Sequence, residues 1–264
     1  MTNLEKQMVE ILDDLKFNHQ VTGVKTEFET EGASFEEALR LKDIVTKTGL
    51  EFTTKIGGCG ALKDMREAGL LGASTIVAPM IESPYAAEKY VKTIKTAFSE
   101  KERKGIRFFI NIETKYGMQY MEEILSADFA KNIDGVVFGR TDMTDSLGMN
   151  SNYADSDIMF NIAEEAAMLT KKYNKEFIVG GAVTTTSIPF FKKLLKNNLS
   201  KYETRKIIFD AQSLQNNNPE IGIIKALEFE KLWIENKQNY FKKILLEDNN
   251  RLEILKARTE FHRV

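Results

Sequence analysis

The sequence predicts one α/β domain built on a parallel barrel of the (β/α)8 TIM type, followed by a long C-terminal helical extension. Short apolar segments alternate with helical segments from residue 21 to residue 215, which favours parallel strands joined by helical crossovers. Several of these segments are apolar at consecutive positions, as is typical of strands with both faces buried. A chain of 264 residues is also long enough for one such barrel.

Seven strands are expected, separated by helices. The strands are expected at 21–28, 51–56, 74–78, 106–112, 133–138, 176–181 and 205–210. The helices are expected near 35–48, 60–70, 84–101, 116–127, 155–173 and 187–198. Because seven strands are one short of a closed barrel, the eighth is expected near residues 17–20 unless the barrel is modified there. A doubly wound open sheet is the alternative, although no glycine-rich phosphate loop follows the first strand.

The chain after Pro219 has a different pattern, which predicts one long helix or two joined helices over 220–261. We therefore expect a barrel with an N-terminal helix over 1–215 and a helical extension over 216–264. A helix of about 40 residues spans roughly 60 Å, more than one barrel can cover. The partly periodic apolar stripe of the extension is thus expected to pack on another copy of the chain, giving a homo-oligomer. The alternative is a helix folded back on its own barrel as two segments.

Composition excludes several classes of function. The chain has 37 basic and 39 acidic residues, a net charge of −2, and no basic cluster, so nucleic-acid binding is not expected. No apolar run approaches the ~20 residues that span a bilayer, and the N-terminus does not resemble a signal peptide. The single cysteine, Cys59, rules out an intrachain disulfide and suits a reducing compartment. A cytoplasmic protein without membrane partners is expected.

Polar residues follow five of the predicted strands, where a buried core would not favour them. In a parallel barrel the functional side chains gather at the carboxyl ends of the strands. The candidates at these ends are Glu29, Lys55, Gly57, Gly58, Glu113, Thr114, Arg140, Thr141, Asp142 and Ala182. This pattern predicts a carboxylate-rich site with a lysine and an arginine nearby.

Glu113 and Asp142 follow neighbouring strands, so their carboxylates can converge. Oxygen ligands suit Mg2+ or Mn2+. Zinc is disfavoured because the only histidines, His19 and His262, lie outside the expected barrel loops. A structural ion-pair network with Arg140 or Lys55 is the alternative to a metal site.

Three segments resemble one known family. They are VAPMIESPYAA (77–87), INIETKYGMQYMEEIL (110–125) and IDGVVFGRTDMTDSLG (133–148). In this order and spacing they resemble the HpcH/HpaI aldolase and citrate lyase beta-subunit family, which belongs to the phosphoenolpyruvate/pyruvate barrel superfamily. The resemblance covers about residues 50–150 well and the remainder loosely.

The resemblance implies roles for individual residues. Glu113 and Asp142 match the two ligands of a divalent metal that chelates a pyruvate-like group, where it stabilises an enolate. Lys55 falls where the family usually has an arginine that contacts the enolate oxygen; lysine keeps the charge and loses the bidentate fork. The candidate substrate-binding residues beside these positions are Gly57, Gly58, Pro79, Thr114, Thr141 and Ala182.

The sequence also departs from the family pattern. Aldolases of the family carry an acidic residue and a catalytic histidine near the first visible strand, where this chain has the sequence EFET (27–30) and no histidine. Glu29 or a metal-bound hydroxide is left as the candidate base. The third motif has Gly-Arg-Thr-Asp in place of the commoner Gly-Pro-Ala-Asp. Arg140 is therefore a candidate for contacting a substrate carboxylate or phosphate, or for a structural bridge to Asp145.

The expected function is a metal-dependent carbon–carbon lyase, an aldolase that acts through the enolate of pyruvate or a similar 2-oxo acid, with an aldehyde as the second substrate. An acyl-CoA lyase of the citrate lyase type is one alternative. A catalytically silent barrel that binds a metabolite or organises an assembly is another, which the missing histidine favours.

Overall fold

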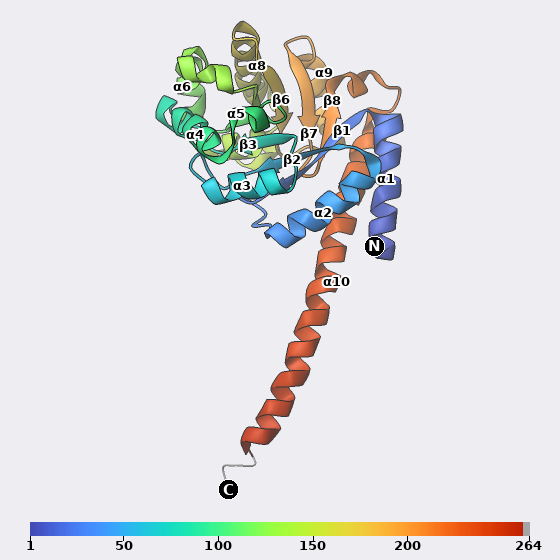
Figure 1. Cartoon of the computed structure of the whole chain (residues 1–264). Coiled ribbons are helices and arrows are strands. Elements are labelled where there is room, and N and C mark those ends of the chain that lie inside the picture. The colour runs from blue at the N-terminus through green and yellow to red at the C-terminus, as the bar shows by residue number, and fades with distance from the viewer. Residues whose placement is uncertain (261–264) are drawn as a thin grey trace.

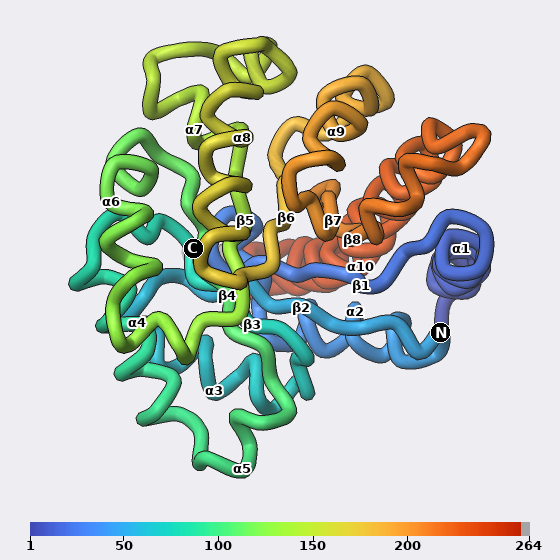
Figure 2. The backbone as a smooth tube through the Cα atoms, turned by 90° about the horizontal axis from the view of Figure 1, so that it is seen from above, coloured from blue at the N-terminus to red at the C-terminus, as the bar shows by residue number. Residues whose placement is uncertain are grey.

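The computed structural model describes residues 1–260, which form a closed eight-stranded barrel surrounded by helices (Figure 1). The predicted barrel class is confirmed, and each predicted strand overlaps an observed one. The strands are β1 Val21–Glu27, β2 Glu51–Lys55, β3 Thr75–Ala78, β4 Arg107–Ile112, β5 Gly135–Gly139, β6 Glu176–Gly180, β7 Leu199–Glu203 and β8 Ile207–Asp210. The helices are α1 Asn3–His19, α2 Phe35–Thr48, α3 Leu62–Leu70, α4 Pro84–Ala97, α5 Glu100–Arg103, α6 Lys115–Ser126, α7 Arg140–Ser146, α8 Asp157–Lys172, α9 Ile188–Leu194 and α10 Pro219–Glu260. Figure 2, a view from above, shows the helices placed around the strands.

The eighth strand and the direction of the last strand differ from the sequence-based expectation. Residues 17–19 end helix α1, and the additional strand is β7, whose mixed sequence LSKYE gives little strand signal. Strands β1 to β7 pair in parallel with their neighbours, whereas β8 is antiparallel to both β7 and β1. Residues 204–206 alone join β7 to β8, too few for a crossover, so the chain reverses as a hairpin. The barrel is therefore modified at its closing strand.

Side-chain caps begin the first helices where the sequence places them. Thr2 and Glu5 form a reciprocal capping box at the start of α1, and Ser34 and Glu37 form another at the start of α2. Helix α2 ends at Gly49, whose φ of 64° lies in the left-handed region that glycine adopts without strain. These local signals set where α1 and α2 begin and where α2 ends, before and after β1 in the chain.

Two apolar clusters form the core of the protein, one outside the ring of strands and one inside it. The larger cluster lies between the strands and the surrounding helices, and it includes Met8, Leu12 and Leu15 of α1. A small separate cluster consists of Val77, Phe109, Val137 and Ile178, which come from four consecutive strands. Because inward and outward side chains alternate along each strand, this cluster fills the barrel interior below the polar strand ends.

Helix α10 is one continuous helix of 42 residues, so the expected alternative of two segments folded back is not found. Its first half packs beside α1 and buries Ile223, Phe229 and Trp233 against the barrel. All residues from 238 to 259 are exposed, and Figure 1 shows this part extending well away from the barrel. Within residues 1–260, no helix combines the length and apolar character that a bilayer span requires.

Candidate active site

A polar pocket of about 390 Å3 opens at the carboxyl ends of the parallel strands. Its floor includes Val137 of the interior apolar cluster, and its walls combine charged and amide side chains with apolar ones such as Val183 and Leu227. The charged and amide side chains on these walls are Lys25, Glu27, Lys55, Asn111, Glu113, Asp142, Glu203, Arg205 and Glu230. The carboxylate-rich site predicted from the strand ends is thus built at the expected end of the barrel.

Glu113, directly after β4, is 2% exposed and is held by two hydrogen bonds. Its Oε1 accepts from the backbone N–H of Met80 at 2.9 Å, and its Oε2 accepts from the Asn111 amide at 2.8 Å. Met80 has a φ of 50°, an uncommon value for a residue with a side chain, and this conformation presents its N–H to the carboxylate. A Cβ at Gly139 would come within 2.7 Å of the Glu113 carboxylate, so glycine at this position allows the close approach of β5.

Asp142, in the first turn of α7, faces Glu113. The Asp142 carboxyl lies within hydrogen-bonding reach of Glu113, and each carboxyl group influences the other's ionisation. Burial raises the pKa of both groups above their ordinary values, although the nearby Lys55 ammonium opposes the shift in each case. The structure therefore brings together the two carboxylates that the sequence placed on neighbouring strand ends.

Lys55, at the end of β2, reaches the same place. Its ammonium is 2.8 Å from Glu29 and 3.6 Å from Glu113, and the side chain is 6% exposed. Burial by itself would lower the pKa of Lys55, but Glu113 and Glu29 more than offset this and raise it, so the side chain is a cation. The ion pair with Lys55 places Glu29 beside the pocket, and the neighbouring residue Thr30 lines the pocket wall.

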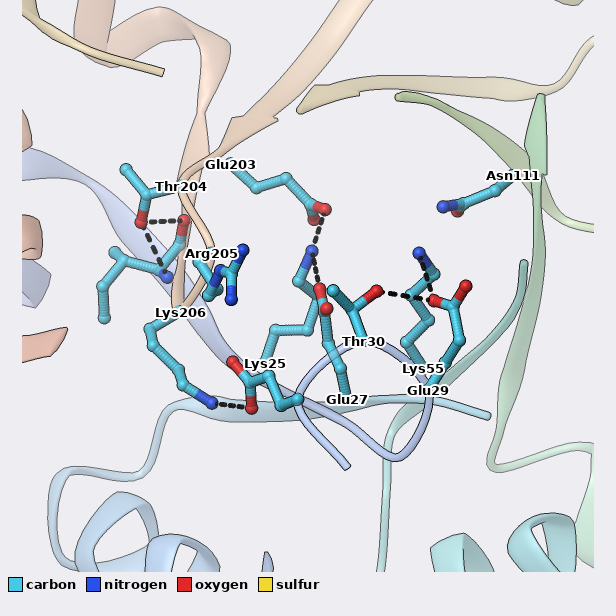
Figure 3. Close-up of polar contacts among 12 residues, drawn as sticks. Lys25, Glu27, Glu29, Thr30, Lys55, Asn111, Glu203, Thr204, Arg205 and Lys206 are labelled. Carbon is cyan, nitrogen blue, oxygen red and sulfur yellow. Dashed lines mark hydrogen bonds and ion pairs between the residues drawn. The ribbon is translucent and has the colours of Figure 1, made fainter. Parts of the chain in front are cut away.

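Lys25 and Glu203 form a second buried charge cluster that sequence analysis did not identify. The Lys25 ammonium is 2.9 Å from Glu27 and also bonds directly to Glu203. Figure 3 shows it between the two carboxylates, with Lys55 and Asn111 across the pocket. Although burial opposes it, this pairing raises the pKa of Lys25 well above its ordinary value. A lysine inside the strand VTGVKTE, whose burial pattern is nearly continuous, was the available signal.

Arg140 lies outside the pocket. It is fully buried and bonds to Asp155, and it donates to the carbonyl oxygens of Gly180 at 3.2 Å and Gly181 at 2.7 Å. Its guanidinium therefore joins the turn after β5 to the turn after β6. The expected bridge to Asp145 is replaced by the pair with Asp155, and the guanidinium is not presented to a substrate in the pocket.

Two of the six candidate substrate-binding residues, Thr141 and Ala182, line the pocket. The other four do not line it: Gly57, Gly58, Pro79 and Thr114. The Gly57 N–H, in the turn before α3, donates to Asp64 in the first turn of α3, and Thr114 caps α6. The roles of Gly57 and Thr114 are therefore a turn contact and a helix cap.

The β7–β8 hairpin contributes a wall that the sequence did not predict. Glu203, Thr204 and Lys206 are between 2% and 4% exposed. Arg205, from the same turn, and Glu230, from α10, line the pocket. Lys206 turns away from the pocket and pairs with Glu31. The antiparallel direction of β8 causes the difference, because it places the hairpin turn at the functional end of the barrel.

Among residues 1–260, no three His, Cys, Asp or Glu side chains are placed to hold a metal ion together. His19 lies at the end of α1, away from the pocket, and His262 lies outside the described residues. Any metal in the pocket would therefore rely on Glu113 and Asp142, with other oxygen ligands completing its coordination.

The fold and the pocket define the class of protein: an α/β barrel with a carboxylate-rich site at its strand ends. Residues 58–185 match the model of the HpcH/HpaI aldolase/citrate lyase family. This match confirms the family resemblance that the motifs around Glu113 and Asp142 predicted. The family is one of aldolase-type lyases.

Solved structures support the fold. An HpcH/HpaI aldolase from Desulfitobacterium hafniense DCB-2 is 13% identical, with a TM-score of 0.62 over 81% of this chain and 85% of that one. The citrate synthase SbnG is 15% identical, with a TM-score of 0.60 over 76% and 82% of the two chains. Macrophomate synthase is also 15% identical, with a TM-score of 0.50 over 75% and 82%. No curated protein matches the sequence significantly.

Proposed function

We propose that this protein is a metal-dependent carbon–carbon lyase that acts through the enolate of pyruvate or a similar 2-oxo acid. The observation that carries the proposal is the convergence of Glu113, Asp142 and Lys55 in one buried polar pocket. Two carboxylates and a cation side by side suit a bound 2-oxo acid whose oxygen becomes an anion during the reaction.

The two carboxylates fit Mg2+ or Mn2+. They supply hard oxygen ligands from two adjacent strand ends, and they leave positions for water and for the two oxygens of a 2-oxo acid. Glu113 keeps its orientation through Met80 and Asn111, which each bond one of its oxygens and leave lone pairs free. When bound, the metal would act as a Lewis acid on the 2-oxo acid.

Lys55 and Glu29 would complete the chemistry. The Lys55 ammonium is fixed by Glu29 and Glu113, so its charge is available to an enolate oxygen without reorganisation. In the cleavage direction, a base takes the proton of the 4-hydroxyl group, the C3–C4 bond breaks, and its electron pair moves to the C2 oxygen. An aldehyde leaves, and the enolate accepts a proton at C3 to give the 2-oxo acid. Glu29 is our candidate for carrying that proton.

A pocket of about 390 Å3 suits a small acid and a short aldehyde. A coenzyme A thioester would have to leave most of its nucleotide outside this volume. We therefore favour the aldolase over the acyl-CoA lyase, and a catalytically silent barrel becomes the interpretation if the following experiment fails.

Exchange of the pyruvate methyl protons for deuterium, followed by NMR with Mg2+, Mn2+ or EDTA, tests the proposal. We expect exchange with a metal and none with EDTA. Glu113→Gln and Asp142→Asn should abolish it, whereas Glu88→Gln, the same kind of change on the surface of α4, should not. A folded wild-type protein that shows no exchange with either metal would refute the proposal.

Binding gives a second measurement that does not depend on turnover. Mg2+ or Mn2+ should raise the melting temperature, and oxalate, which resembles the enolate of pyruvate, should raise it further. Saturation at 100 times the dissociation constant stabilises the folded state by about 2.7 kcal/mol. The shift should be lost in the Asp142→Asn variant and kept in the Glu88→Gln variant.

A further inference from the structure

The pocket continues beyond Glu113 and Asp142, toward β1, the β7–β8 hairpin and α10. This extension is lined by Lys25, Glu203, Arg205 and Glu230, none of which has a role in forming an enolate. Figure 3 shows Lys25, Glu203 and Arg205 grouped on one side, opposite Lys55 and Asn111. An aldolase needs a place for its aldehyde next to the enolate, and this extension adjoins it.

Hydrogen-bonding groups in the extension and on the wall opposite it are not fully used by the protein. The Asn111 side chain is 4% exposed, and its Oδ1 has no donor. Buried acceptors in folded proteins nearly always have a partner. Two N–H groups of the Lys25 ammonium are directed to Glu27 and Glu203, which leaves its third N–H able to donate to a ligand. A ligand with hydroxyl groups could satisfy both.

Arg205 and Glu230 add a donor and an acceptor at the mouth of the pocket. The nearest approach between the guanidinium and the carboxylate is 3.9 Å, which is too long for a hydrogen bond. The Arg205 side chain is 51% exposed and that of Glu230 is 21% exposed. Both groups can therefore turn to a ligand without breaking a hydrogen bond to each other.

The net charge of the pocket disfavours an anionic aldehyde. Five carboxylates and three cations line it. A bound divalent metal would balance these charges, and the carboxylate of the 2-oxo acid would again leave an excess of negative charge. A second anionic group is therefore disfavoured.

We propose that this extension binds the aldehyde substrate, and that the aldehyde is neutral and carries several hydroxyl groups, as in a short aldose. Asn111 and Lys25 would bond the hydroxyl groups near the enolate, and Arg205 and Glu230 those at the mouth. The assignment rests on the proposed aldolase function and names its second substrate.

Aldol addition of pyruvate to matched acceptors tests the assignment. Glyceraldehyde and erythrose are compared with propanal and butanal, which have the same carbon chains without the hydroxyl groups, and with succinic semialdehyde and glyceraldehyde 3-phosphate. We expect kcat/KM for the hydroxylated acceptors to be at least tenfold higher than for the others. Preference for an alkyl or an anionic acceptor would overturn the assignment.

Substitutions at the mouth of the pocket test whether the aldehyde binds there. Arg205→Met should raise KM for erythrose several-fold with a smaller change in kcat, whereas Arg66→Met, an exposed change on α3, should have no effect. Equal effects of Arg205→Met on erythrose and butanal would argue against hydroxyl recognition. Absence of pyruvate proton exchange would instead refute the aldolase function itself, so the two failures are distinguishable.

The exposed part of α10 supports a second, independent inference. Residues 238–259 are exposed and extend about 33 Å at 1.5 Å per residue, and only the start of this segment, at Tyr240, Phe241 and Ile244, lines a groove beside α2. Exposed apolar side chains recur on one face of this segment: Phe241, Ile244, Leu245, Leu252 and Leu255. An isolated helix with such a stripe is poorly stabilised in water.

Four of the five side chains are placed symmetrically along the sequence around Asp248. Phe241 and Leu255 lie seven residues on either side, and Ile244 and Leu252 lie four residues on either side. Two such helices running antiparallel, with a two-fold axis at Asp248, would match these apolar side chains on both sides of a central Asp248 pair, and Leu245 would lie opposite Arg251. Ten side chains from two copies would bury on the order of 1,000 Å2, near the lower limit for a specific interface.

We infer that the exposed segment of α10 pairs antiparallel with the same segment of a second copy. Leu252→Asp should dissociate the dimer in sedimentation or light-scattering measurements, whereas Leu246→Asp, on another face of the helix, should not. Because the axis brings two Asp248 carboxylates together, Asp248→Leu should lower the dissociation constant at least tenfold. A monomer at all concentrations, or equal effects of the two leucine variants, would refute the inference.

Discussion

Replacement of Arg140 by methionine is expected to destabilise the fold by about 4 kcal/mol, although the residue does not line the pocket. Arg140 is fully buried and bonds to Asp155 and to the carbonyl oxygens of Gly180 and Gly181. Its guanidinium also donates to the Ala154 carbonyl oxygen at 3.3 Å. Methionine has similar reach but no donors, so all four acceptors lose a partner. The turns after β5 and β6 would then no longer be joined.

The magnitude follows from two contributions. Removing one partner of a buried ion pair costs about 3–5 kcal/mol. The Asp155 side chain is 28% exposed, so water recovers part of the loss and the lower end, about 3 kcal/mol, applies. The guanidinium also lies 4.9 Å and 4.8 Å from the ring centres of Phe190 and Phe191, and losing these contacts adds about 1 kcal/mol.

Urea unfolding of the wild type, Arg140→Met, Asp155→Leu and the double variant measures these contributions. We expect the double variant to be more stable than Arg140→Met, because no carboxylate is then left without its partner. The exchange rate of pyruvate protons should fall in Arg140→Met, since Thr141 and Asp142 follow the same turn. A loss below 1 kcal/mol, or strictly additive effects, would refute the structural role assigned to Arg140.

Three further predictions concern buried positions. Gly135→Ala should destabilise the fold by about 1–3 kcal/mol in urea unfolding, because its Cβ would lie 2.1 Å from the Phe109 ring. Lys206→Met should cost about 3 kcal/mol in the same assay by leaving Glu31 unpaired, and adding Glu31→Gln should recover most of it. Burial lowers the pKa of His19 below its ordinary 6.5, so the native state resists protonation. The free energy of unfolding should therefore fall as the pH drops below 6.5. The His19→Gln variant should lose less of this free energy between pH 7 and pH 5 than the wild type does.

Local signals explain which parts of the fold were predicted correctly. The capping residues Thr2 and Ser34 begin helices, and Gly49 ends one, through contacts with residues only a few positions away. Apolar runs likewise identified strands such as IRFFINI because burial on both faces leaves a continuous pattern. Strand β7 was missed because its residues include Ser200 and Lys201, which break that pattern.

The composition of the site was partly predictable for a related reason. A parallel barrel brings the strand ends to one edge, so Lys55, Glu113 and Asp142 could be placed together from order alone. Arg140 could not be assigned, because Asp155 and Gly181 lie 15 and 41 residues further along the chain. Its burial depends on how two turns pack.

The sequence by itself determined seven of the eight strands in their order, the family motifs and the pair of carboxylates at neighbouring strand ends. The tertiary structure alone decided that β8 runs antiparallel, and with it that Glu203 meets Lys25, 178 residues away, inside the pocket. The physical reason is range. Helix caps and apolar periodicity act over a few residues, whereas the direction of a closing strand depends on the pairing of both barrel edges.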